Sequence, residues 1–135
     1  MTSPLRETRA MISGMSPRLD PAEYVFRATD DVALASRARG WFREDEGVSL
    51  IVEREAAATR GFDVSLPMKR IVLEVHSALD GVGLTAAVAS ALAAEGIPCN
   101  VVAAFRHDHV FVPSERAGRA MEVLDALAIS PRCGE

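Results

Sequence analysis

The chain has 135 residues, 25% of them charged, and a formal net charge of −4, so it can form one compact domain or two small halves sharing a core. Hydrophobic residues make up 49%, which excludes a disordered chain, and the acidic balance argues against nucleic acid as the main partner. The longest apolar stretch, residues 84–94, is too short to span a bilayer.

The amino terminus and the cysteines predict a cytoplasmic protein. Arg6, Glu7 and Arg9 lie where a secretory signal would need an apolar run. Cys99 and Cys133 are therefore expected to stay reduced, and no disulfide is predicted.

Short helical and strand patterns alternate along the first half of the chain. Ser3-Pro4 can cap and begin a short amphipathic helix that ends at Ser16-Pro17. Residues 23–29 are rich in β-formers and predict a strand, which the turn-prone pair Asp30-Asp31 ends before a loop.

An acidic turn then separates two further strands. Residues 41–43 and 48–52 have strand composition, and residues 44–47 between them form a turn closed by a glycine. A short helix over residues 53–60 follows and ends at Gly61.

The second half has sharper patterns. Residues 61–69 show no clear period and are expected to connect the halves. Residues 71–76 alternate as a strand, and residues 78–83 form a glycine-containing turn. From Leu84 the apolar positions follow one helical face until Gly96 and a proline end the helix.

A hairpin and a helix complete the pattern. Residues 99–105 and 110–112 predict strands joined by a turn, and Pro113-Ser114 begins a last helix. The order β-α-β-β-α predicts an α+β, ferredoxin-like fold of the βαββαβ type, with an antiparallel sheet and its helices on one face.

The closing strand of that fold has no obvious source after the last helix. Only residues 129–135 follow it, so the strand is either absent or supplied by another segment, such as one from the first half, or by a second copy of the chain. An open sheet edge would favour two halves pairing side by side or a dimer.

One segment of the second half, residues 71–102, resembles the ACT domain, a small ligand-binding regulatory module. In that family a strand ends in a turn with an aspartate and a glycine, a helix follows, and a glycine, an isoleucine and an asparagine lead into the next strand. The corresponding positions are Asp80, Gly83, Leu84, Gly96, Ile97, Asn100 and Val101.

The strings FREDEG, HSALDGVGLTAAV, CNVVA and HDHVFVP also look like a bacterial group of small proteins with two ACT-like halves. The resemblance implies a degenerate half over residues 1–66 and a second half over residues 67–135. It further implies an amino acid or similar effector bound between two modules, with contacts from Asp80, Gly81, Val82, Gly83, Leu84, Asn100 and Val101. The family's common proline before the glycine is Val82 here.

The chemistry of the turn suits a zwitterion. Free amides at a helix N-terminus attract a carboxylate, and glycines allow a ligand close to the main chain. Asp80 would then pair with an ammonium group. In the alternative reading, Asp80 only caps the helix, while Gly81 and Gly83 only make a tight turn.

A second hypothesis is a small metal-dependent enzyme. His107 and His109 would share one face of a strand, about 6 to 7 Å apart, and His76 is the only obvious third imidazole, with Glu44 or Asp108 as a base. A hydrogen-bonded turn explains the same residues without a metal, so neither a metal nor a cofactor is expected.

The remaining polar groups show no assembled catalytic motif. Arg43 and Glu44, in the acidic turn, are expected either in a solvated loop or at the rim of the ligand pocket. Cys99 is expected as a small buried hydrophobe, and no Walker, dinucleotide or G-x-S-x-G motif occurs.

These observations favour a non-catalytic sensor that binds a small molecule, the resemblance indicating an amino acid. A homodimer and a separate regulated protein are the expected partners, with no nucleic acid and no membrane. A purely structural dimerisation module, in which the glycine turn is only a turn, is a third hypothesis.

Overall fold

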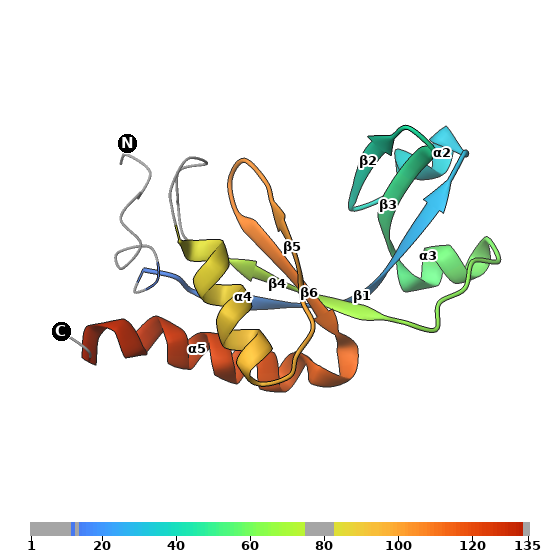
Figure 1. The fold of residues 1–135 in the computed structure, drawn as a ribbon. Coiled ribbons are helices and arrows are strands. Elements are labelled where there is room, and N and C mark those ends of the chain that lie inside the picture. The colour runs from blue at the N-terminus through green and yellow to red at the C-terminus, as the bar shows by residue number, and fades with distance from the viewer. Residues whose placement is uncertain (1–11, 13, 75–82, 134–135) are drawn as a thin grey trace. The chain divides into compact units, whose positions relative to one another are not determined.

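The computed structural model describes residues 12, 14–74 and 83–133 (Figure 1). The chain divides into two compact units. Unit 1 contains residues 1–20 and 69–135, and unit 2 contains residues 21–68. The predicted first helix lies outside the described residues, except that Ile12 and Met15 are buried in the core of unit 1.

Unit 1 is a sheet with helices on one face. Its strands follow the order β1-β4-β6-β5, with β5 and β6 paired antiparallel. The elements are β1 (Pro17–Thr29), of which residues 17–20 belong to this unit, β4 (Met68–Leu73), α4 (Leu84–Ala94), β5 (Asn100–Ala103), β6 (Asp108–Pro113), the short 3-10 helix η1 (Ser114–Arg116) and α5 (Ala117–Cys133).

The first residues of β1 supply the closing strand of this sheet. They lie beside β4, where the amide of Glu74 donates to the carbonyl of Ser16 at 2.9 Å. Of the sources considered from the sequence, a segment of the first half is therefore the one found.

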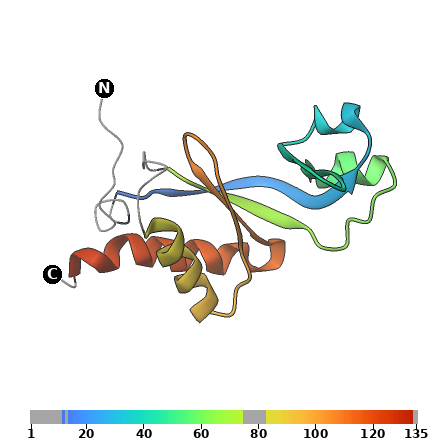
Figure 2. The same ribbon diagram turned by 45° about the horizontal axis from the view of Figure 1, so that its top comes forward.

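The core of unit 1 lies between the sheet and the helices. Alternate residues of β4 and β6, among them Ile71 and Val110, face Val88 and Leu92 of α4 and Leu124 of α5. All five side chains are fully buried. Figures 1 and 2 show α4 and α5 together on one side of β4, β5 and β6, which confirms the predicted ferredoxin-like arrangement.

Unit 2 repeats the β-α-β-β-α order with shorter helices. Its strands follow the order β2-β3-β1, and its core contains Val25, Leu34, Leu50, Val52 and Ala57. Its elements are residues 21–29 of β1, α2 (Val32–Ala35), β2 (Gly40–Glu44), β3 (Gly47–Glu53) and α3 (Arg54–Thr59).

Two predictions for this region were wrong. A helix, α2, replaces the loop expected after Asp30-Asp31, because the Asp31 side chain accepts a hydrogen bond from the Ala33 amide and caps it. Strand β1 begins at Pro17 instead of residue 23. The first residues of β1 were not predicted because they include Pro17 and Pro21, and proline, which cannot donate a hydrogen bond to a ladder, argues against a strand.

No helix in the described part of the chain is long and apolar enough to cross a membrane.

Candidate functional site

The start of α4 carries the predicted ligand site, of which Gly83 and Leu84 are described; Asp80, Gly81 and Val82 lie outside the described residues. Gly83 caps the helix with φ 102°, a left-handed conformation that glycine adopts without steric cost. Leu84 is buried in the core of unit 1. Its side chain anchors the helix, which leaves its backbone as the part that can face a ligand.

The first turn of α4 has a positive electrostatic character. The helix has 11 residues, and its first turn contains no acidic side chain. The first amides of a helix lack intrahelical partners and carry the positive end of the macrodipole. This helix start is therefore suited to an anionic group such as a carboxylate.

The two other predicted ligand residues lie elsewhere in unit 1. Asn100 is exposed at the start of β5, and Val101 packs against the core. Strands β4 and β5 run parallel because α4 connects them as a crossover. Asn100, the first residue of β5, therefore lies at the same end of the sheet as the first residue of β4. Gly83 follows the other end of β4, and α4 is about 16 Å long. The structure does not bring Asn100 beside Gly83.

The histidines of the metal hypothesis have different surroundings. The Nδ1 atom of His109 accepts a hydrogen bond from Arg70 Nη1 at 3.0 Å, which occupies that ring nitrogen. The Nδ1 atom of His107 is buried without a hydrogen-bond partner among the described residues. Burial raises the pKa of Asp108 between them, and the nearby His107 partly offsets this. His76 lies outside the described residues, which contain no group of three or more side chains placed to hold a metal ion.

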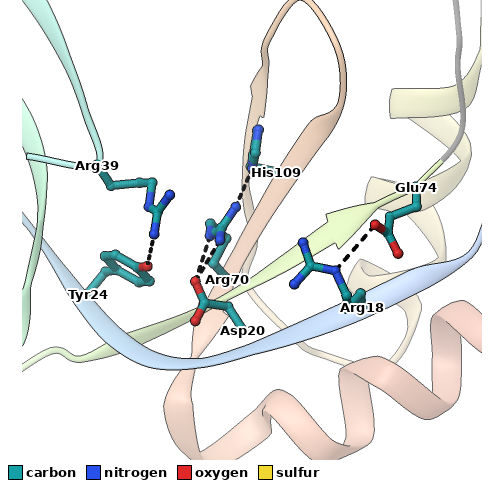
Figure 3. A network of polar contacts seen from close by, with 7 residues as sticks. All are labelled: Arg18, Asp20, Tyr24, Arg39, Arg70, Glu74 and His109. Carbon is teal, nitrogen blue, oxygen red and sulfur yellow. Dashed lines mark hydrogen bonds and ion pairs between the residues drawn. The ribbon is translucent and has the colours of Figure 1, made fainter.

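A buried polar cluster joins the closing strand to the middle of the unit 1 sheet (Figure 3). Arg70 donates from Nε and Nη2 to Oδ2 of Asp20, at 2.9 and 2.7 Å, and its third nitrogen contacts His109. Asp20 and Arg70 are only 7% and 8% exposed. Nearer the end of β4, Arg18 and Glu74 form a second, exposed ion pair at 3.3 Å.

Sequence reasoning did not find this cluster. Asp20 and Arg70 are separated by fifty positions, and Asp20 lies between two prolines in a segment without a strand pattern. The one usable signal was Arg70 itself, a charged residue at the start of an apolar strand. Because the arginine is fully engaged, the cluster fixes the closing strand and is not an open binding site.

The other predicted residues are placed as follows. Arg43 and Glu44 are exposed on β2 in unit 2, where Glu44 accepts a hydrogen bond from the Ser49 hydroxyl. Cys99 is partly buried against the core of unit 1, and burial raises the pKa of its thiol. Cys99 is thus less buried than the sequence predicted, although it packs against the core as a small apolar side chain would. The raised pKa disfavours the reactive thiolate.

The ACT domain family matches the chain twice, over residues 4–69 and over residues 67–126. The chain belongs to the ACT domain family. The two ACT matches meet at the start of β4. The chain also passes from one compact unit to the other there, but it makes an earlier passage, from unit 1 to unit 2, at residues 20–21. The difference arises because residues 17–20 complete the sheet of unit 1.

Solved structures show the same fold. A Vibrio cholerae protein, described as of unknown function and as a possible transport protein, is 39% identical with a TM-score of 0.80, covering 89% of this chain and 94% of its own. The ligand-free regulatory subunit of aspartate kinase from Thermus thermophilus is 12% identical with a TM-score of 0.63, covering 84% of this chain and 97% of its own. No curated protein matches.

Proposed function

We propose that this chain is a cytoplasmic, non-catalytic regulatory protein that binds an amino acid, or a similar zwitterion, at the start of α4. The observation that carries the proposal is the left-handed Gly83, which opens a helix without acidic side chains in its first turn. Membership of the ACT family and the likeness in fold to a regulatory subunit support a regulatory role.

The proposed contacts divide between the two charges of the ligand. The first amides of α4, including that of Leu84, bind the carboxylate. Gly81 and Gly83 allow it close to the main chain because they have no Cβ, and Val82 between them is a further contact of the turn. Asp80 pairs with the ammonium group.

The other predicted contacts need a different source. Asn100 and Val101 follow the end of α4 that is opposite to Gly83. They can contact the same ligand only if they belong to a second ACT module that packs against the start of α4. Arg43 and Glu44 keep a proposed place at the rim of the pocket. A ligand held between modules binds their docked arrangement more tightly than the separated one, and this difference is what regulates a partner protein.

A thermal-shift screen against the twenty amino acids tests the proposal. A bound ligand at a hundred times its dissociation constant stabilises the folded chain by about 2.7 kcal/mol, so the melting temperature should rise for one or a few compounds. Gly83→Ala should abolish this shift, because a side chain at φ 102° displaces the first turn.

Gly96→Ala is the matched control. Gly96 ends the same helix with φ 70°, and a Cβ added there meets nothing within 4 Å. The variant should therefore be destabilised by backbone strain but keep the ligand-induced shift. If no amino acid raises the melting temperature, or if the two variants lose the shift equally, the proposal is wrong and a structural module becomes the better account.

A further inference from the structure

Three polar side chains from neighbouring strands form a row on one face of the unit 1 sheet. Strand β4 lies between β1 and β6, and these strands contribute Asp20, Arg70 and His109 (Figure 3). Side chains alternate between the two faces of a strand. Ile71 and Val110 belong to the core beneath α4 and α5. Their neighbours Arg70 and His109 therefore lie on the opposite face of the sheet, away from both helices.

The hydrogen bond from Arg70 determines which protons His109 carries. A guanidinium has five N–H donors and no acceptor, and it stays protonated at any ordinary pH. Arg70 Nη1 lies 3.0 Å from His109 Nδ1, so Nδ1 must accept, and the ring must be the neutral tautomer with its proton on Nε2. An imidazolium carries a proton on both nitrogens. It cannot accept this bond, and its positive charge would lie against that of Arg70.

Asp20 stabilises Arg70 but is too far from His109 to pair with an imidazolium. It accepts two hydrogen bonds from Arg70, at 2.9 and 2.7 Å. Two strand spacings, roughly 9 to 10 Å, separate β1 from β6. Asp20 and Arg70 are only 7% and 8% exposed, so little water screens them from an added charge. The cluster is neutral overall with a neutral ring and has a net positive charge with an imidazolium.

The other charged groups of unit 1 near His109 lie on the opposite face or are already paired. Asp108 and Lys69 alternate with His109 and Arg70 along their strands, so they lie on the face that the helices cover. Glu74, just after the end of β4, already forms an ion pair. Strand β5, the other neighbour of β6, has no charged residue. Among the described residues of unit 1, a proton on His109 therefore meets mainly the charge of Arg70.

We propose that His109 is a pH-sensitive switch that controls the attachment of the closing strand to unit 1. Neutral His109 holds the Arg70 guanidinium in the orientation in which it binds Asp20, and so keeps residues 17–20 of β1 beside β4. Protonated His109 repels Arg70, and the Arg70–Asp20 pair loses its fixed geometry. This part of β1 then separates from β4 more readily.

The direction of the pH effect follows from where the proton binds. A histidine in the unfolded chain takes up a proton at about pH 6.5, whereas the folded cluster excludes it. The opened chain therefore binds more protons below that pH, and the folded state loses stability as pH falls. If His109 stays neutral in the fold, the equilibrium constant for opening rises about tenfold between pH 7.5 and pH 5.5.

Urea unfolding of the full chain at pH 7.5 and pH 5.5 measures this effect. His109→Asn keeps an acceptor in the place of Nδ1 but does not titrate. The unfolding constant of the natural chain should therefore rise about tenfold more than that of His109→Asn. Equal rises in the two proteins would overturn the proposal.

His107→Asn is the matched control. The Nδ1 atom of His107 has no hydrogen-bond partner among the described residues, so no bond is lost when this ring takes up a proton. The variant should keep the rise of the natural chain. A rise that is lost in His107→Asn but kept in His109→Asn would assign the effect to the wrong histidine and refute the switch.

A second measurement locates the effect on the closing strand and needs no variant. The amide of Glu74 donates to the carbonyl of Ser16 at 2.9 Å, so its protection from hydrogen exchange reports whether β1 stays beside β4. This protection, corrected for the intrinsic effect of pH, should fall about tenfold between pH 7.5 and pH 5.5. Nuclear magnetic resonance should show the Nε2–H tautomer of His109 at pH 7.5.

Unchanged protection of the Glu74 amide, or a proton on His109 Nδ1 at pH 7.5, would contradict the proposal even if the variants failed to fold. None of these measurements includes an amino acid. Their failure would therefore leave the ligand proposal at α4 untouched.

Discussion

Arg70 and Asp20 form an ion pair inside the sheet of unit 1. They are nearly buried, and Asp20 accepts two hydrogen bonds from one guanidinium. Breaking a buried pair leaves one charge without compensation and costs about 3–5 kcal/mol. We expect Arg70→Met to lower the free energy of unfolding by about 3 kcal/mol in urea titrations.

Arg18→Met is the control for that change, because Arg18 and Glu74 form the neighbouring pair with side chains 53% and 43% exposed. Exposed pairs contribute about 0–1 kcal/mol. Equal losses in the two variants would show that burial of the Arg70 pair has no energetic consequence.

The contribution of Asp108 to folding stability should change with pH in the opposite direction to that of a typical carboxylate. Burial raises its pKa above 3.8 in the folded chain, so folding disfavours the ionised form. Its unfavourable contribution is absent below pH 3.8, grows as pH rises through the folded pKa, and is complete at neutral pH. Asp108→Asn should therefore stabilise the chain at pH 7, by less than about 1 kcal/mol because the side chain is only partly buried.

Asp63 gives the contrasting case. Hydrogen bonds from Ser65 lower its pKa below 3.8, so its contribution favours folding above that pH and is lost as pH falls through the folded pKa. Asp63→Ala should destabilise at pH 7, whereas Asp108→Asn should stabilise. Urea unfolding at pH 7 and pH 3 measures both, and a loss of stability in Asp108→Asn at pH 7 would refute the assignment.

At the scale of elements, the helices and strands that the sequence predicts are those whose ends and faces are marked by a local residue pattern. The β2–β3 hairpin, α3 and α4 were found because glycines and alternating or helical apolar patterns mark their ends and faces. Strand β1 was found only in part, since Pro17 and Pro21 hide its first residues. Helix α2 was missed because it has four residues, and its stability comes from one capping aspartate and from Leu34 in the core.

Helix α4 also shows what no local pattern could give. Arg116 donates to the carbonyls of Glu95 and Gly96, at 3.2 and 3.4 Å, where the helix ends. A guanidinium there satisfies free carbonyls and complements the negative end of the helix dipole. The start of the helix was predictable from its glycines, but this partner lies twenty residues away and depends on the tertiary fold. The distance between Asn100 and Gly83 likewise follows from strand direction and not from spacing.

At the scale of the whole molecule, two ACT domains in sequence do not correspond to two compact units in space. Unit 1 takes its closing strand from residues 17–20, which precede unit 2 in the chain. The sequence left the source of this strand open, because pairing between distant segments has no local signal. The buried Asp20–Arg70 pair and the core residues Ile12 and Met15 hold the borrowed segment in unit 1.

This connectivity predicts how the chain behaves when it is cut. A protease site inserted between Ser65 and Leu66, in the connection before β4, separates residues 1–65 from residues 66–135. If the first piece completes the sheet of unit 1, the two pieces should co-elute in size-exclusion chromatography, and Arg70→Met should promote their separation while Arg18→Met should not. Separation of the unaltered pieces would mean that each stretch folds alone, because a borrowed strand cannot leave without opening the sheet edge along β4.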